Sequence, residues 1–232
     1  MHVEPPSHAP TNLKELGVHY LMIVLGILTA LGLEGGFEAL HHRRLARHTV
    51  EQVETELQAN LTEVRASLAQ NRAGLNELMG LYGDVKKLAE RGEVKPGVLK
   101  ELLNAKLRIG IVTPGLRRDA WDTAVADQAL VHLPHDELRR LSEAYTGQRE
   151  AQQAIQTSFG AIGSFSRLTD AMVDAEFGRG DPVDLLKALQ SYRLTLVAIV
   201  GVEQDLEKQL AGSLGHAGAG PAAAPASAAA RH

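Results

Sequence analysis

Residues 16–33 read LGVHYLMIVLGILTALGL and carry no charged side chain between Glu15 and Glu34. At 18 residues the run lies near the lower end of the roughly 17–25 that a helix needs to cross the hydrocarbon core of a bilayer. A helix on the surface of a soluble protein keeps a polar stripe, whereas only Thr29 is polar between Tyr20 and Leu33. The run therefore predicts one membrane-spanning helix.

A secretory signal peptide is the alternative interpretation of this run. Such a peptide begins with a basic segment and ends at a cleavage site made of small residues. Here only Lys14 precedes the run, and EGGFE, residues 34–38, follows it. We therefore expect the helix to be retained as an anchor.

Basic residues close to the run predict its orientation, because Lys and Arg gather on the cytoplasmic side of membrane helices. Lys14 precedes the run, whereas Arg43, Arg44 and Arg47 follow it. This bias predicts that the body of the protein lies in the cytoplasm, with a periplasmic body as the alternative. The three arginines are also placed to contact anionic lipid headgroups.

The composition of the chain bounds its class. A total of 232 residues with 4% aromatic side chains favours one all-α domain over a sheet protein. The net charge of −4 gives no basic face for nucleic acid, so we expect no nucleic-acid partner. The absence of cysteine excludes disulfides, thiolate metal sites and a cysteine nucleophile, and it suits either side of a bacterial inner membrane.

Apolar residues continue at helical spacing beyond the span and predict one long helix that reaches about Glu90. Gly35-Gly36, just past the span, leaves the continuity of this helix open. An eleven-residue repeat predicts a nearly straight apolar stripe. The stripe comprises Val50, Val53, Leu57, Leu61, Val64, Leu68, Leu75, Leu78 and Val85.

Proline and glycine divide the rest of the chain into four further helices and a long loop. We expect a helix from Pro96 to about Arg108, a loop over 109–118, a helix over 119–133 and a long helix over 134–177. Asp181-Pro182 is an N-cap followed by proline at the first helical position, so a last helix starts there. The expected buried residues of these helices include Trp121, Val125, Leu130 and the run 194–202.

These elements predict an all-α fold in which an N-terminal transmembrane helix continues into an elongated antiparallel bundle of the four-helix type. The expected parts are a disordered leader (1–12), a transmembrane anchor (13–36), a helical-bundle domain (37–214) and a disordered low-complexity tail (215–232). Short breaks between long helices favour neighbours that run antiparallel.

No pattern in the chain indicates catalysis, and we expect no catalytic, cofactor or metal site. Glu38 and His41 have the Glu-x-x-His spacing of di-iron bundles, but such a site needs a second pair and two more carboxylates. Gly26 and Ala30 are four residues apart in the span, a spacing of small residues that favours self-association of membrane helices.

Three polar residues fall where the apolar stripes of the later helices are expected to be buried: Gln148, Gln152 and Glu203. Buried amides and carboxylates need hydrogen-bond partners. We expect either a polar layer that fixes the register of the helices or a small ligand pocket between them. The layer is the preferred interpretation.

Three successive stretches of the chain resemble a family of uncharacterised bacterial membrane-anchored proteins. They are LGVHYLMIVLGILTALGLEGGFEALHHRR, a helix with VETELQANL, and DAWDTAVADQALVHLPHDELRRLSEAY. Proteins of this family have one N-terminal transmembrane helix and a helical-bundle body, and the resemblance covers most of residues 13–176. It implies architecture and the bacterial inner membrane, and it implies no activity. We expect a non-enzymatic module that scaffolds, senses or binds a partner; a receptor or enzyme that uses the bundle interior is the alternative.

Overall fold

The computed structural model describes residues 13–92, 97–160 and 163–215, so the predicted leader and nearly all of the predicted tail lie outside the described residues. Within these ranges the secondary structure is helical and no strand occurs, which confirms the predicted all-α class. The elements are α1 (Leu13–Arg91), α2 (Val98–Lys106), α3 (Asp119–Ala126), the 3₁₀ helix η1 (Ala129–His132), α4 (His135–Gly160), α5 (Gly163–Glu176) and α6 (Pro182–Gly215).

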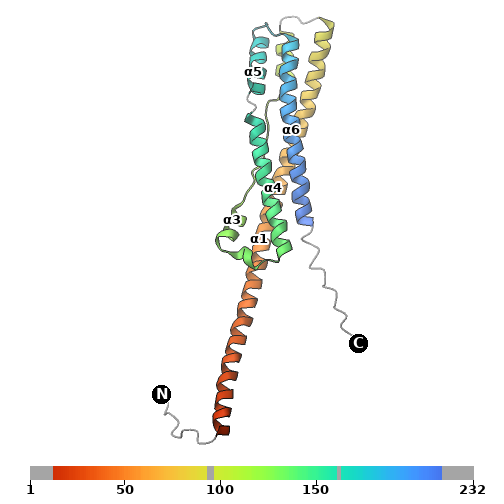
Figure 1. The fold of residues 1–232 in the computed structure, drawn as a ribbon. Coiled ribbons are helices and arrows are strands. Elements are labelled where there is room, and N and C mark those ends of the chain that lie inside the picture. The colour runs from red at the N-terminus through yellow and green to blue at the C-terminus, as the bar shows by residue number, and fades with distance from the viewer. Residues whose placement is uncertain (1–12, 93–96, 161–162, 216–232) are drawn as a thin grey trace, which may run out of the picture.

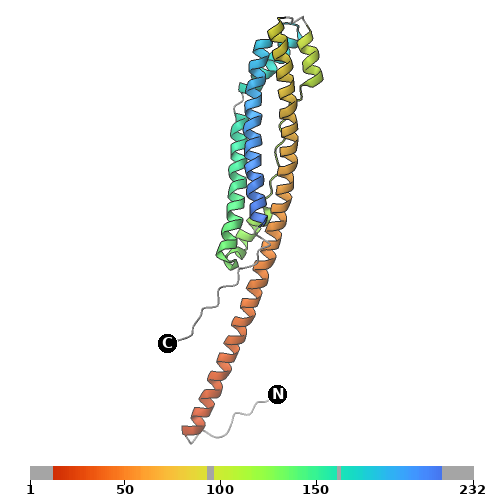
Figure 2. The ribbon, with the colours of Figure 1, turned by 90° about the vertical axis from the view of Figure 1, so that its right-hand side faces the viewer.

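Helix α1 runs for 79 residues without a break, including Gly35-Gly36. At 1.5 Å per residue it is about 120 Å long. Its C-terminal half forms one wall of the bundle, and its N-terminal part projects alone beyond the bundle (Figures 1 and 2). The helix ends at Gly92, whose φ of 65° lies in the left-handed region that glycine adopts without strain.

Helix α6 is the central element of the bundle, because it contacts α1, α4 and α5. It descends between α1 on one side and α4 followed by α5 on the other (Figure 1). Seven residues at helical spacing form its inner stripe, and all are buried: Leu185, Leu189, Tyr192, Leu196, Ile199, Leu206 and Leu210. The cap is also confirmed, since the Asp181 carboxylate accepts a hydrogen bond of 2.7 Å from the backbone N–H of Val183.

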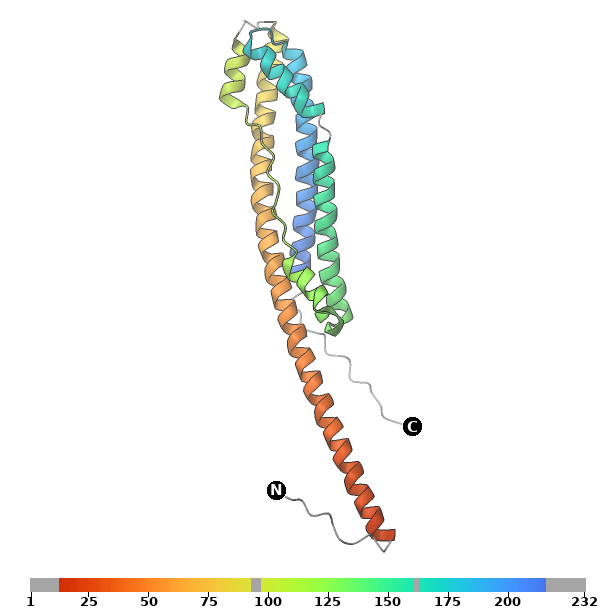
Figure 3. The same cartoon turned by 90° about the vertical axis from the view of Figure 1, so that its left-hand side faces the viewer.

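The expected four-helix arrangement differs in the path that descends from α1 to α4. This path is helical in α2 and α3, but residues 107–118 between them are extended and lie along α1 (Figure 3). The sequence RIGIVTPGLRR explains the difference, because β-branched residues, two glycines and Pro114 all disfavour helix. The predicted loop is therefore a long straight segment.

One predicted helix is interrupted in the structure, and another is described in two parts. The helix expected over 119–133 breaks at Gln128, which has a left-handed φ of 55°, and continues as η1. The prediction that Val125 is buried is wrong, since its side chain is 52% exposed and Ala124 is buried instead. The helix expected over 134–177 is described as α4 and α5, on either side of residues 161–162.

The core consists of two apolar clusters separated along the bundle. Helix α1 contributes residues up to Val64 to the lower cluster and residues from Leu78 onward to the upper one. Three buried polar side chains of α1, Asn60, Ser67 and Asn71, lie along its inner face at or between these levels. The run 194–202 was expected to be the most buried part of α6, but Leu194 is 57% exposed because no helix covers the outer face there.

Trp121 of α3 packs partly buried against the lower cluster and stacks on Tyr145 of α4, with ring centroids 4.9 Å apart. A fully buried tryptophan costs about 3–5 kcal/mol when cut to alanine. We expect Trp121→Ala to lower the free energy of unfolding by about 2 kcal/mol, since the ring is only half-buried. Denaturant unfolding of the full chain in detergent micelles measures this loss.

Val125→Ala is the matched control, because Val125 lies one turn further along α3 and faces solvent. Its effect should stay within about 0.5 kcal/mol. Equal, small effects of the two substitutions would contradict the packing role of Trp121.

Candidate functional site

The extended segment, residues 107–118, is here called the strap, and two asparagines of α1 hold it. The Asn71 amide accepts from the N–H of Val112 at 2.9 Å and donates to its C=O at 2.8 Å. Asn60 pairs in the same way with Arg117, at 2.9 Å and 2.8 Å. Both amides are buried. Each therefore satisfies a backbone donor and acceptor as a neighbouring strand would.

The spacing of the two asparagines matches the spacing of their partners. Asn60 and Asn71 are eleven residues apart, which on a helix is about 16.5 Å. Val112 and Arg117 are five residues apart, which in an extended chain is also about 16.5 Å. Because alternate residues of an extended chain point to opposite edges and five is an odd separation, the regular alternation is interrupted between Val112 and Arg117, in the stretch that holds Pro114 and Gly115. The matched lengths let both pairings form, so α1 acts as a template for the strap.

Glu203 of α6 joins the same layer from the opposite side. Its side chain is 0% exposed, and both carboxyl oxygens lie 3.0 Å from the amide nitrogen of Asn71. One oxygen also forms a short hydrogen bond with the Ser67 hydroxyl, which in turn lies 2.8 Å from the C=O of Val112. No Lys, Arg or His among the described residues forms an ion pair with Glu203.

The contacts of Ser67 favour a protonated Glu203. The hydroxyl has one hydrogen but lies between two acceptors, the carboxyl of Glu203 and the C=O of Val112. A protonated Glu203 donates to Ser67, and Ser67 donates to Val112, which satisfies both contacts without a buried charge. Burial raises the pKa of the Glu203 carboxyl, and the hydrogen bonds with Ser67 and Asn71 lower it by less.

The three polar residues predicted for the core lie in different places. Gln148 is buried and accepts a hydrogen bond of 3.1 Å from Asn60, so it belongs to the Asn60 layer. Its own amide nitrogen has no partner in the described part of the chain. Glu203 belongs to the Asn71 layer, and Gln152 is only half-buried. The predicted polar layer is thus two layers, each linked to the strap through α1.

Sequence reasoning did not identify Asn60, Ser67 or Asn71. A signal was present, because the eleven-residue repeat of the apolar stripe also relates Thr49, Asn60 and Asn71, and all three are buried. Polar residues that recur every eleven residues, like the apolar residues of the core, indicate that another segment of the chain lies along this helix and bonds to them.

Further contacts fix the two ends of the strap. The Tyr192 hydroxyl lies 3.1 Å from the N–H of Gly110 and 3.3 Å from its C=O. The Glu56 carboxylate accepts from the N–H of Ala120 at 2.9 Å, near the N-terminus of α3, and from the Tyr145 hydroxyl at 2.6 Å. Helix α3 has no side-chain cap of its own, so Glu56 fills this role from α1. Burial, and then Glu56, raise the pKa of Tyr145.

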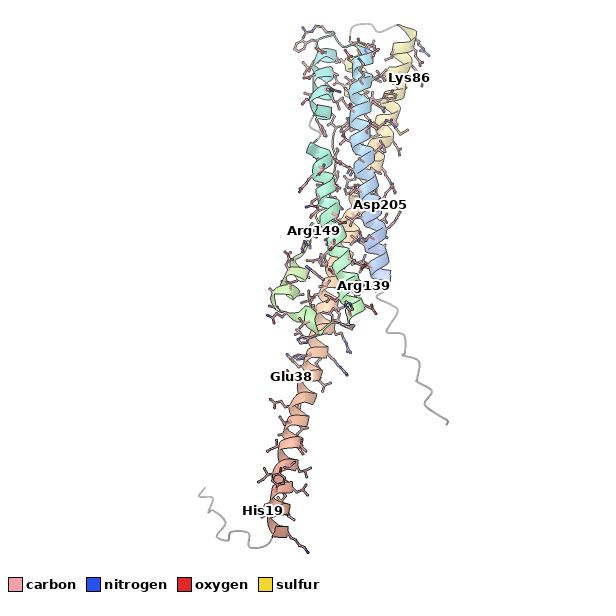
Figure 4. The ribbon with its side chains drawn as sticks, viewed as in Figure 1. His19, Glu38, Lys86, Arg139, Arg149 and Asp205 are labelled. Atoms are coloured by element: carbon pink, nitrogen blue, oxygen red, sulfur yellow. The ribbon has the colours of Figure 1, made fainter. Side chains whose placement is uncertain are left out.

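The projecting part of α1 is the second notable surface. Among the described residues, two helices are long and apolar enough to cross a membrane by length and composition, Gly17–Arg91 within α1 and α6. Helix α6 is a core helix whose most apolar window is 39% buried, whereas the window in α1 is 0% buried. An N-terminal signal sequence passes the same test. Figure 4 shows His19 and Glu38 on this projecting part.

Arg43, Arg44 and Arg47 are exposed on α1 where it enters the bundle. Beside them the His42 ring stacks on His132 of η1, with centroids 3.9 Å apart. His42 and Glu38 approach at 3.9 Å, but the described residues contain no group of three metal-binding side chains. Lipid binding by these arginines stays a prediction.

Gly26 and Ala30 lie on the exposed surface of the projecting helix. A side chain added at Gly26 would meet open space. Self-association through this face stays a prediction.

Comparisons with protein-family models, with curated proteins and with solved structures find no match to this chain. The resemblance to membrane-anchored bacterial proteins therefore stays a prediction.

Replacing Asn71 by alanine leaves the N–H and C=O of Val112 and the Glu203 carboxyl with fewer partners. Unsatisfied buried polar groups cost about 1–3 kcal/mol each. We expect Asn71→Ala to lower the free energy of unfolding by about 3 kcal/mol, measured by denaturant unfolding in micelles. Asn104→Ala, on the exposed face of α2, is the control. Similar losses for the two variants would rule out the pairing as a stabilising feature.

The state of Glu203 predicts a pH dependence. A carboxyl whose pKa is raised by folding contributes stability that is complete below the unfolded value of about 4.5 and is lost as pH rises through the folded value. Glu203→Gln imitates the protonated form, since its amide also donates to Ser67. We expect the variant to melt higher than wild type at pH 8 and at the same temperature near pH 4.5.

Glu207→Gln is the control for this experiment, because Glu207 lies one turn away and pairs with Arg65 at the surface at 2.9 Å. It should show no such gain at pH 8. A Glu203→Gln variant that melts lower than wild type at every pH would refute a neutral Glu203.

Proposed function

We propose that this chain is a single-pass protein of the bacterial inner membrane whose helical bundle is a non-enzymatic module that holds a partner close to the bilayer. The observation that carries the proposal is the projecting part of α1, whose 18-residue apolar window is 0% buried. Leu21, Ile23 and Leu28 on it are each more than 60% exposed.

The exposed apolar side chains on the projecting part of α1 are unfavourable in water. Burying a leucine or isoleucine side chain is worth about 1.5–3 kcal/mol, and soluble monomers rarely expose apolar patches above a few hundred Å². Because the exposed side chains surround the helix, a lipid environment covers them better than one protein groove would. Their chemistry therefore favours a membrane anchor.

Charged residues beyond the apolar run agree with this placement. Arg43 to Arg47 lie 10 to 14 residues past Leu33, or about 15–21 Å along the helix axis, which is beyond the hydrocarbon core. Each contributes about 1 kcal/mol near an anionic leaflet. The same bias supports a cytoplasmic body, with a periplasmic body as the alternative.

The interior of the bundle supports a module more than a receptor or an enzyme. Two of the three polar side chains considered as pocket residues are engaged in the fold: Gln148 with Asn60, and Glu203 with Ser67 and Asn71. Groups that bind a ligand are instead presented to an open cavity. These bonds make a structural role the better explanation of the buried polar residues.

Deleting residues 1–36 tests the anchor. We expect the full chain to stay with the membrane pellet after washing with salt and with sodium carbonate, and the shortened chain to remain in the supernatant as a helical protein. Centrifugal fractionation with immunoblotting and circular dichroism measures both.

Replacing Leu21, Leu25 and Leu28 by glutamate in the full chain is the matched control and should also release it. Recovery of the full chain in the soluble fraction without detergent would contradict the proposal. A reporter fused after Leu214 assigns the side of the membrane without affecting this result.

A further inference from the structure

We propose that the strap is an open β-strand edge that binds an extended peptide segment of a partner protein, one with an apolar centre and acidic ends. The inference gives the proposed holding function a definite surface and rests on that function. Strand addition to an exposed edge is a common mode of peptide recognition, in which main-chain hydrogen bonds supply much of the affinity.

Over residues 109–113 the hydrogen bonds of the strap are confined to one edge. Gly110 and Val112, two residues apart, direct their N–H and C=O groups to Tyr192 and Asn71. In an extended chain the backbone groups of alternate residues point to opposite edges. Ile111 therefore directs its N–H and C=O groups away from the helices.

Ile109 and Thr113 share the direction of Ile111, because each is two residues from it. Within the described residues, no protein group forms a hydrogen bond with the backbone N–H or C=O of Ile109, Ile111 or Thr113. The outer edge of the strap thus offers a row of donors and acceptors about five residues long.

This edge is already fixed in an extended shape. Asn71 and Tyr192 hold its two paired residues, and the neighbouring Pro114 is buried. A strand that is ordered before binding does not lose conformational entropy when a peptide pairs with it, which favours affinity. An unpaired edge of this kind also acts as a template for another strand.

The side chains of the strap define the chemistry of the peptide. Ile109 is 45% exposed and Val112 is 38% exposed, and the segment is rich in β-branched residues that suit a paired strand. An apolar centre in the peptide would cover these two side chains.

Two exposed arginines of the strap favour acidic residues at the ends of the peptide. Arg108 and Arg117 flank the edge and are exposed, and neither forms an ion pair with any described residue, whereas Arg118 is paired with Asp122. Acidic residues about nine positions apart would meet both arginines. A second copy of the strap would bring arginine against arginine, so the strap of another molecule of this chain fits poorly.

The test uses the full chain in detergent micelles and the labelled, blocked peptide Glu-Glu-Val-Thr-Val-Thr-Val-Glu-Glu. Two matched peptides carry N-methyl groups, one on the three valines and the other on the two threonines. Because one edge of the peptide faces the strap, we expect one methylated peptide to bind at least about tenfold more weakly and the other to bind like the parent. Fluorescence anisotropy measures the affinities.

Variants of the strap test the site itself. Thr113→Pro removes one N–H from the open edge and should weaken binding about tenfold, whereas Thr113→Val keeps that N–H and should bind normally. Arg108→Glu with Arg117→Glu should weaken binding of the parent peptide and favour a peptide with lysines in place of the glutamates. Circular dichroism checks that each variant keeps its helices.

Absence of binding by the parent peptide, or equal binding of the two methylated peptides, would overturn the proposal. Retained binding by the folded Thr113→Pro variant would do so too. Because these experiments are done in micelles, they fail or succeed independently of membrane fractionation, which tests the anchor.

Discussion

The bundle depends on the pairing of two buried asparagine amides with the backbone of an extended segment. Helices satisfy their own backbone groups, but a strand laid against helices does not. Asn60 and Asn71 supply the missing donors and acceptors, and their eleven-residue separation on α1 covers the same length as the five-residue separation of Val112 and Arg117 in the strap. The descending path can therefore be extended rather than helical, which leaves a bundle of three helical columns and a strap.

The same requirement accounts for the composition of the core. Asn60, Ser67 and Asn71 interrupt the apolar stripe of α1 where the strap lies along it. The apolar core is divided there into a lower and an upper cluster. Glu203 of α6 and Gln148 of α4 each bond to one of the asparagines. Each asparagine thus joins the strap to two helices, which fixes the axial register of α1, α4 and α6. A neutral Glu203 makes this possible without an uncompensated charge in the bundle.

Features set by local sequence could be predicted, and features set by distant neighbours could not. The end of α1 at Gly92, the cap at Asp181 and the inner stripe of α6 follow from periodicity and from single residues. Gln148 and Glu203 were predicted to be buried polar groups, because they interrupt apolar stripes. Their partners were not, since Asn60 and Asn71 meet the strap 57 and 41 residues further along the chain. The exposure of Leu194 depends on the absence of a neighbouring helix, which periodicity does not report.

An exposed apolar helix at one end and a rigid, half-paired strap along the bundle suit a protein that keeps a partner near a membrane. The binding role of the strap depends on whether Asn60 and Asn71 hold it in its extended shape. Amide hydrogen exchange measured by NMR on the full chain in micelles tests this most directly. The account predicts strong protection of the Val112 and Arg117 amides, rapid exchange at Ile111 and Thr113, and loss of protection at Val112 when Asn71 is replaced by alanine. Rapid exchange at all four amides of the wild-type chain would contradict it.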